Sequence, residues 1–191
     1  IGGNMDQRKL KEIGDKGVIS MICDSTNVFS EGRAGSEGEV RESMLRIMEG
    51  KSKKIIVTSF ASNVARMETI FYCAKKTGRN ICLVGRSMHR IYKAARKCGY
   101  MQNLVEPMDS RDAKKIPREK IIYLCTGTQG EPMGAMNRIV NGVHPDVYLE
   151  QGDTVIFSSK IIPGNEKKLY QLHNLITKAD VEIITEENAF V

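Results

Sequence analysis

Small polar residues follow short apolar runs at five places in this sequence: DSTN (24–27), FASN (60–63), GRSM (85–88), TGTQGEP (126–132) and SSKIIPGNE (158–166). Small residues let a ligand approach the backbone, and hydroxyl and amide groups donate hydrogen bonds to anionic oxygens without adding charge. Together the five segments indicate a phosphate-rich ligand.

The same residue types also cap helices, where each contributes about 1 kcal/mol. Ser36 and Glu39 have the spacing of a capping box, so we assign that pair to structure. Ser62 or Asn63 could cap the helix that follows, and Asn165 could cap the last helix. For each of these three residues taken alone, capping is favoured over ligand contact.

Asp24 ends an apolar run, where an ionised carboxylate is costly unless a cation or hydrogen-bond donors meet it. The alternative is a turn in which Asp24 accepts from the amides of Thr26 and Asn27. Local sequence supports the two interpretations equally.

A basic stripe follows the third segment. The spacing predicts a helix with Arg86, Arg90, Lys93 and Lys97 on one face and Met88, Ile91, Ala95 and Cys98 on another. Such a stripe beside a strand end could follow a phosphate backbone, although a merely solvated face is the commoner explanation.

Several kinds of site lose their usual support. The three histidines, His89, His144 and His173, have no metal-ligand spacing, and His173 falls in a helical segment where a structural role is expected. The five cysteines include no C-x-x-C pair, which favours a reducing compartment over a zinc knuckle. The glycine fingerprints of dinucleotide sites and phosphate-binding loops are missing, and so is the serine-hydrolase elbow.

Composition points to one globular domain, because 191 residues at 41% hydrophobic can bury a core without disulfides or a structural metal. No run approaches the roughly 18 to 20 apolar residues that span a bilayer, and no signal pattern opens the chain, so we expect a soluble intracellular protein. A formal charge of +6 and a pI near 9.1 favour polyanionic partners such as RNA, DNA or acidic lipid.

Short runs rich in β-branched residues alternate with segments of helical period, which predicts an α/β fold: a mostly parallel sheet flanked by helices on both faces. In such sheets ligands gather at the carboxyl ends of the strands, where all five polar segments are expected. The predicted strands are 18–24, 54–60, 81–85, 121–127, 154–159 and 181–185.

The segment 123–140 is expected to contain a buried strand at 123–125 and a turn at 126–131. Pro132 would then stand in the first turn of a helix. The core-facing residues of that helix would be Met133, Met136, Ile139 and Val140.

Read in order, seven stretches resemble the ribonuclease J family of β-CASP metallo-β-lactamase nucleases, from about Gly2 to Val191. These are GVISMICDSTN, SEGEV, VTSFASNVARMETI, GRSMHRI, LCTGTQGEPMGAMNRI, GDTVIFSSKIIPGNE and ENAFV.

The resemblance implies a single Rossmann-like β-CASP domain over 1–191, with 1–30 beginning as the end of the metallo-β-lactamase part. Family members process and degrade RNA with two zinc ions held by that other part, and the β-CASP domain covers the substrate cleft. The metal motifs belong before Ile1, and a His-x-Ser-Gly-His segment belongs after Val191. This piece alone is therefore expected to bind no metal and to be inactive.

Residue roles follow from the same resemblance. Asp24 would orient a histidine outside this chain. Ser62 and Asn63, with Ala61 beside them, would bind the terminal phosphate or the RNA backbone near the scissile bond. A second phosphate-side loop would contain Ser158, Ser159, Gly164 and Asn165, and TGTQGEP would shape the cleft wall. Where the family commonly has proline this chain has Ile161, and the adjacent Lys160 could add a phosphate contact.

The implied partners are RNA and the metallo-β-lactamase domain, with no membrane, in a cytoplasmic protein whose full form is a homo-oligomer. The alternative is a free-standing α/β nucleotide-binding module without nuclease activity. The missing glycine fingerprints argue against this alternative.

Overall fold

The computed structural model describes residues 5–24, 28 and 35–191, and the chain divides into two compact units, Ile1–Gly35 and Ser36–Val191. In the first unit, the helix α1 (Gln7–Asp15) is capped by Asp6, whose carboxylate accepts from the Lys9 amide at 2.9 Å. No residue of α1 is buried. Of the residues described, none lies in a helix with the length and apolar character needed to cross a membrane.

The second unit alternates helices with strands. Its elements are α2 (Glu37–Glu49), β1 (Ile55–Thr58), α3 (Val64–Lys76), β2 (Asn80–Val84), α4 (Arg86–Lys97), α5 (Ser110–Ala113), the 3-10 helix η1 (Arg118–Lys120), β3 (Ile121–Cys125), α6 (Ala135–Val140), β4 (Thr154–Phe157), α7 (Glu166–Lys178) and β5 (Glu182–Ile184).

The strands form one sheet of five in the order β2-β3-β1-β4-β5, and every neighbouring pair is parallel. Every residue of β1, β3 and β4 is buried, because helices cover both faces. The predicted α/β fold and five of its six predicted strands are confirmed.

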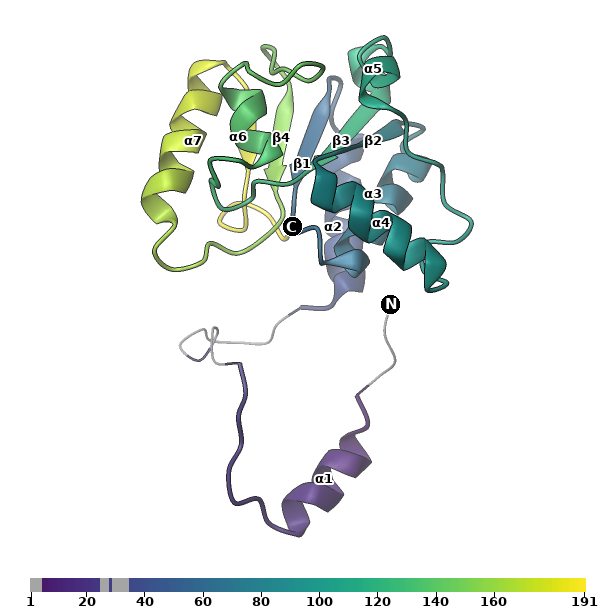
Figure 1. Cartoon of the computed structure of the whole chain (residues 1–191), viewed down its shortest axis with the longest axis vertical. Coiled ribbons are helices and arrows are strands. Elements are labelled where there is room, and N and C mark those ends of the chain that lie inside the picture. The colour runs from purple at the N-terminus through teal and green to yellow at the C-terminus, as the bar shows by residue number, and fades with distance from the viewer. Residues whose placement is uncertain (1–4, 25–27, 29–34) are drawn as a thin grey trace. The chain divides into compact units, whose positions relative to one another are not determined.

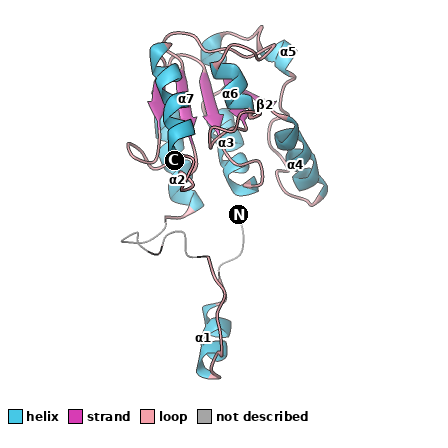
Figure 2. Cartoon of the chain, turned by 60° about the vertical axis from the view of Figure 1, so that its left-hand side comes forward, coloured by secondary structure: helices cyan, strands magenta, loops and turns pink. Residues whose placement is uncertain are grey.

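Helices cover both faces of the sheet (Figure 1 and Figure 2), and each face has its own hydrophobic core. Helices α2, α3 and α4 pack on the face that displays Ile55, Val57 and Leu124. Helices α5, α6 and α7 pack on the face that displays Ile56 and Tyr123. Successive residues of a strand point to opposite faces, so each buried strand supplies both cores.

The prediction of a strand at 18–24 is wrong. Residues 18–24 are exposed and lie in no helix or strand, and Ile19 and Ile22 have essentially fully accessible side chains. A strand needs a hydrogen-bonded neighbour to satisfy its backbone, and no described segment pairs with this one.

The predicted helix start at Pro132 is also wrong, because α6 begins at Ala135 and Met133 is 87% exposed. The Gly134 amide donates to the Glu131 carbonyl at 2.9 Å, which places Pro132 and Met133 in a turn instead. A Cβ at Gly134 would lie 2.6 Å from the Gly127 Cα, so this turn requires glycine. The buried strand at 123–125 is confirmed, as are the buried positions of Met136 and Ile139, while Val140 is half-buried.

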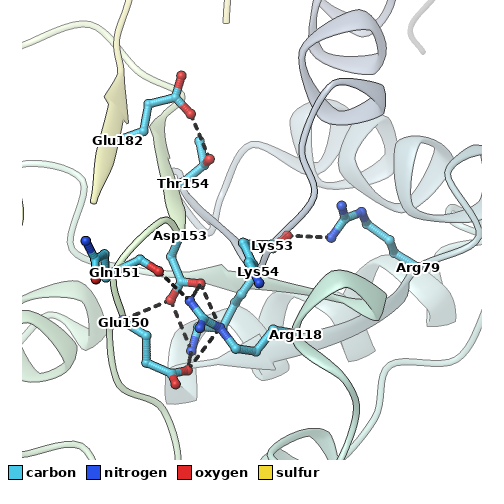
Figure 3. A network of polar contacts seen from close by, with 9 residues as sticks. All are labelled: Lys53, Lys54, Arg79, Arg118, Glu150, Gln151, Asp153, Thr154 and Glu182. Carbon is cyan, nitrogen blue, oxygen red and sulfur yellow. Dashed lines mark hydrogen bonds and ion pairs between the residues drawn. The ribbon is translucent and has the colours of Figure 1, made fainter. Parts of the chain in front are cut away.

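A charged network closes the edge where the strands begin (Figure 3). The buried Lys54 ammonium lies 3.0 Å from Glu150 and 3.2 Å from Asp153, and the Arg118 guanidinium lies 2.7 Å from the other Asp153 oxygen. Arg79 donates to the Lys53 carbonyl at 2.8 Å. These contacts join the start of β1 to the starts of β3 and β4. The polar loops lie at the opposite, carboxyl ends of the strands.

Candidate functional site

The connections that follow β1 and its two neighbouring strands leave the sheet on different faces. The loop after β1 leads to α3 on one face of the sheet, whereas the loops after β3 and β4 lead to α6 and α7 on the other face. Neighbouring strands whose connections part in this way mark the usual ligand position in open α/β sheets, and we call this position, between the loops that follow β1, β3 and β4, the crevice.

The loop after β1 contains three of the predicted site residues. Ser62 is exposed, and Ala61 and Asn63 are half-buried. Asn63 is the N-cap of α3, and its side-chain carbonyl accepts from the Arg66 amide at 3.0 Å. The capping role considered for Asn63 is therefore confirmed, and the amide nitrogen of the same side chain is the group that remains as a donor.

Ser59, directly after β1, was not among the predicted site residues. Its backbone amide donates to the Cys125 carbonyl at 3.2 Å, which extends the strand pairing by one residue. Its hydroxyl is buried and has no hydrogen-bond partner in the described part of the chain. Buried hydroxyls are usually satisfied, so Ser59 is a candidate ligand contact. Sequence alone does not identify Ser59 as a site residue, because a serine at the end of an apolar run is assigned to the strand.

Arg66 holds Ser158 at the end of β4. Its guanidinium pairs with Glu37 at 2.9 Å and donates to the hydroxyl and the carbonyl of Ser158. Ser158 is buried as a result of this packing. Sequence reasoning missed Arg66, because its partners Glu37 and Ser158 are 29 and 92 residues away in the chain.

Gln129 of TGTQGEP anchors the loop after β4. Its buried side-chain amide donates to the Lys160 carbonyl at 2.9 Å and to the Ser159 hydroxyl at 3.2 Å. Its carbonyl accepts from the Ile162 amide at 2.8 Å and from the Asn165 side chain at 3.4 Å. One side chain therefore fixes the whole loop.

Three further predicted residues lie in this anchored loop. The Ser159 hydroxyl also bonds the Thr128 hydroxyl. The Gly164 amide donates to the Glu166 carboxylate at 2.7 Å. Asn165 stands at the N-cap position of α7 but makes no side-chain cap bond, so the capping role considered for it is wrong.

Asp24 lies in the first unit, exposed, in the segment that follows α1. The turn considered for it involves Thr26 and Asn27, which lie outside the described residues. Asp24 is thus separate in the chain from the loops that the sheet assembles, and its role stays a prediction.

The predicted basic stripe is present on α4. Arg86, Arg90, Lys93 and Lys97 are exposed, and Met88 and Ala95 are buried. Cys98, which was predicted on the apolar face, is exposed because it follows the last residue of the helix.

The groups at the crevice are suited to binding rather than to covalent chemistry. Burial raises the pKa of the Cys125 thiol, at the end of β3, to about 12, so this thiol stays protonated and unreactive at neutral pH. Hydroxyl and amide groups supply donors for an anion, whereas the Arg66 guanidinium is already engaged by Glu37 and Ser158. Within the described ranges, no group of His, Cys, Asp and Glu could hold a metal ion.

Comparison with known proteins matches most of the second unit to a known family. Residues 52–176 match the family model described as "Ribonuclease J, beta-CASP domain". The chain is 36% identical over its whole length to "Ribonuclease J" of Sinorhizobium meliloti, of which it covers 34%. It is 39% identical to "Ribonuclease J 1" of Streptococcus pyogenes over 96% of the chain and 33% of that protein. It is 31% identical to "Ribonuclease J2" of Bacillus subtilis over 94% of the chain and 32% of that protein. The chain thus spans about a third of the length of the curated relatives it matches.

Proposed function

Since the chain belongs to the ribonuclease J family as its β-CASP domain, we propose that it holds the RNA substrate while a metal centre elsewhere in the same protein cleaves a phosphodiester. The observation that carries this proposal is the divergence of the loops at the carboxyl end of β1, where the loops after β1 and β4 present hydroxyl and amide donors. A domain of this kind contributes orientation and effective concentration rather than new bonds.

Within the crevice we assign the terminal phosphate or the adjacent RNA backbone to Ser62 and Asn63, with Ala61 leaving room beside them. The buried Ser59 hydroxyl is added to this set because it has no partner among the described residues. Ser158, Ser159, Gly164 and Asn165 would form the second side, and its shape depends on Arg66 and Gln129. Lys160 is exposed in that loop and would add a positive charge near the phosphate.

The partner domain would be a metallo-β-lactamase fold in the same protein, with 1–30 as the end of that fold. Support comes from the exposed run 18–22, in which Val18, Ile19, Met21 and Ile22 are all accessible. Four neighbouring apolar side chains in water are unusual, and β-branched residues suit a strand that completes another sheet. Asp24, directly after this run, would then orient a histidine of the catalytic part.

For the whole protein we propose two zinc ions, a cytoplasmic location and a homo-oligomer. The zinc ions, held by residues outside this chain, would supply an activated water and stabilise charge on the phosphoryl group. The free-standing nucleotide-binding alternative is not favoured, because relatives about three times as long contain this segment.

The test compares the 191-residue chain with the longer natural protein that contains it. We expect zinc-dependent cleavage of single-stranded RNA by the longer protein and none by the chain alone.

Ser62→Ala in the longer protein should raise KM about fivefold, because the substrate loses one hydrogen bond. Ser52→Ala changes another exposed serine, before β1 at the opposite edge, and should leave KM unchanged. Robust zinc-dependent cleavage by the chain alone would refute the proposal.

A further inference from the structure

A hollow with a basic lining lies at the carboxyl ends of β2 and β3. It is a pocket of about 780 Å³ whose lining includes Arg86, Arg90 and His89 from α4, Arg138 from α6, and His144 from the loop after α6. Its residues are distinct from those assigned to the crevice.

The three arginines of this pocket have no acidic partner in the part of the chain that the structure describes, in contrast to Arg66, which pairs with Glu37. The carboxylates nearest the histidines are engaged elsewhere. Asp109 pairs with Arg111 at 3.0 Å, and Asp146 bonds Ser110 and Lys114. Three guanidinium groups around one hollow repel each other, and a bound anion would relieve that repulsion.

His144 adds a neutral donor. Its Nδ1 accepts from the backbone amides of Asp146 at 3.3 Å and Val147 at 3.1 Å, which leaves the proton on Nε2. Burial, together with the positive charge of Arg138, lowers the pKa of His144, so the neutral donor form is favoured.

The start of α4 completes the lining. Gly85 is its N-cap, with φ of 111° and no side chain to cap the first amides of this 12-residue helix. A Cβ at Gly85 would lie 2.8 Å from the Thr126 hydroxyl, so the residue must be glycine. Uncapped amides at a helix N-terminus favour the binding of an anion. In this pocket they lie at the start of the helix that contains Arg86 and Arg90.

We propose that this pocket binds a phosphodiester of single-stranded RNA, as a second holding point on the same edge of the sheet as the crevice. The inference rests on the proposed function and extends it. The TGTQGEP turn borders both places, because Thr126 lines the pocket and Gln129 anchors the crevice loop. The ends of β1 and β2 are two strands apart, about 10 Å, so one extended polyanion reaches both.

The first test uses the histidines as reporters. Two of the three histidines, His89 and His144, line the pocket, and His173 lies on α7. Adding a short oligoribonucleotide to the 191-residue chain should shift the side-chain nitrogen resonances of His89 and His144 and leave those of His173 in place. Inorganic phosphate and a mononucleotide are titrated in parallel. If phosphate or the mononucleotide shifts the His89 and His144 resonances as fully as the oligoribonucleotide does at the same concentration, the pocket is a small-anion site and the RNA assignment is overturned.

The second test exploits the stripe on α4. Arg90→Gln and Arg138→Gln should each lower affinity for the oligoribonucleotide about tenfold and reduce the salt slope by about one. Lys93→Gln removes the same charge from the same exposed face of α4, outside the pocket lining, and should change affinity less than twofold. All three residues are exposed, so folding should be preserved.

Equal losses for Arg90→Gln and Lys93→Gln would overturn the pocket and leave only diffuse charge attraction. Absence of RNA binding by the unmodified chain would overturn it as well. Neither result touches the cleavage assay of the longer protein, so failure of the pocket is distinguishable from failure of the proposed function.

Discussion

Gln129 is the residue on which the crevice loop depends most. It is buried, and its amide contacts four groups between Ser159 and Asn165. Gln129→Ala should lower the free energy of unfolding by about 1–3 kcal/mol, because several buried partners lose their hydrogen bonds. Urea unfolding measures the loss, and hydrogen exchange at the Ile162 amide should accelerate.

Gln171→Ala is the matched control for Gln129→Ala, because Gln171 is exposed on α7. This substitution should change stability by less than about 0.5 kcal/mol. Unchanged exchange at Ile162 in the Gln129 variant would show that the loop is held by other contacts.

His173 makes stability sensitive to mild acid. Burial lowers the pKa of His173 from its ordinary 6.5, and its ring packs edge-on to Phe157 at 4.5 Å. A histidine with a lowered pKa binds fewer protons folded than unfolded, so stability is lost as pH falls below 6.5. His144, whose pKa is also lowered, acts in the same direction.

Thermal melts between pH 7.5 and 5 should therefore show falling stability, and His173→Phe should reduce that dependence. Carboxylates such as Asp146, whose hydrogen bond from Ser110 lowers its pKa below 3.8, act in a separate and more acidic range. A pH dependence identical in the variant would assign the effect to other groups.

At the scale of single residues, the sequence indicated the polar loops but not the contacts within them. Ser62, Asn63 and the loop 158–165 could be located because they follow apolar runs. Arg66 and Gln129 could not, since their partners are 92 and up to 36 residues away in the chain. Contacts at such separations depend on the arrangement of the whole sheet.

At the scale of elements, the network at the start of the strands joins β1, β3 and β4. Asp153 is fully buried between Lys54 and Arg118. Asp153→Asn should cost about 3 kcal/mol, because the buried Lys54 and the partly exposed Arg118 lose the buried one of the two carboxylates they share and keep only Glu150. Chemical denaturation measures this cost.

Asp112→Asn is the comparison for Asp153→Asn. Asp112 pairs with Lys115 at 2.8 Å on the surface, where both side chains are largely exposed. The expected cost is below about 1 kcal/mol. Similar costs for the two variants would contradict the role given to the buried network.

Hydrophobic pattern alone identified the five strands of the sheet, because buried parallel strands read as continuous apolar runs. It failed at 18–24, where the run is equally apolar but has no neighbouring strand among the described residues. It also misplaced the start of α6, because the close approach of Gly127 and Gly134 is a tertiary contact.

At the scale of the whole molecule, both cores belong to the second unit. No described residue before Ser36 contributes to either core. A chain that begins at Ser36 should therefore melt within about 2 °C of the 191-residue chain. Differential scanning calorimetry measures both.

Removal of 179–191 should have the opposite effect, because it deletes β5 and the core residues Ile184 and Val191. We expect a loss of about 2–5 kcal/mol or of cooperative folding altogether. A large drop in melting temperature for the chain that begins at Ser36 would contradict the independence of the second unit.

The placement of the charged network has an evolutionary consequence. Ion pairs that stabilise the domain lie where the strands begin, and the candidate binding loops lie where the strands end. Substitutions in the exposed parts of those loops can therefore alter which nucleic acids are gripped without first unfolding the domain. Such a division lets recognition diverge among relatives while the scaffold stays under separate selection.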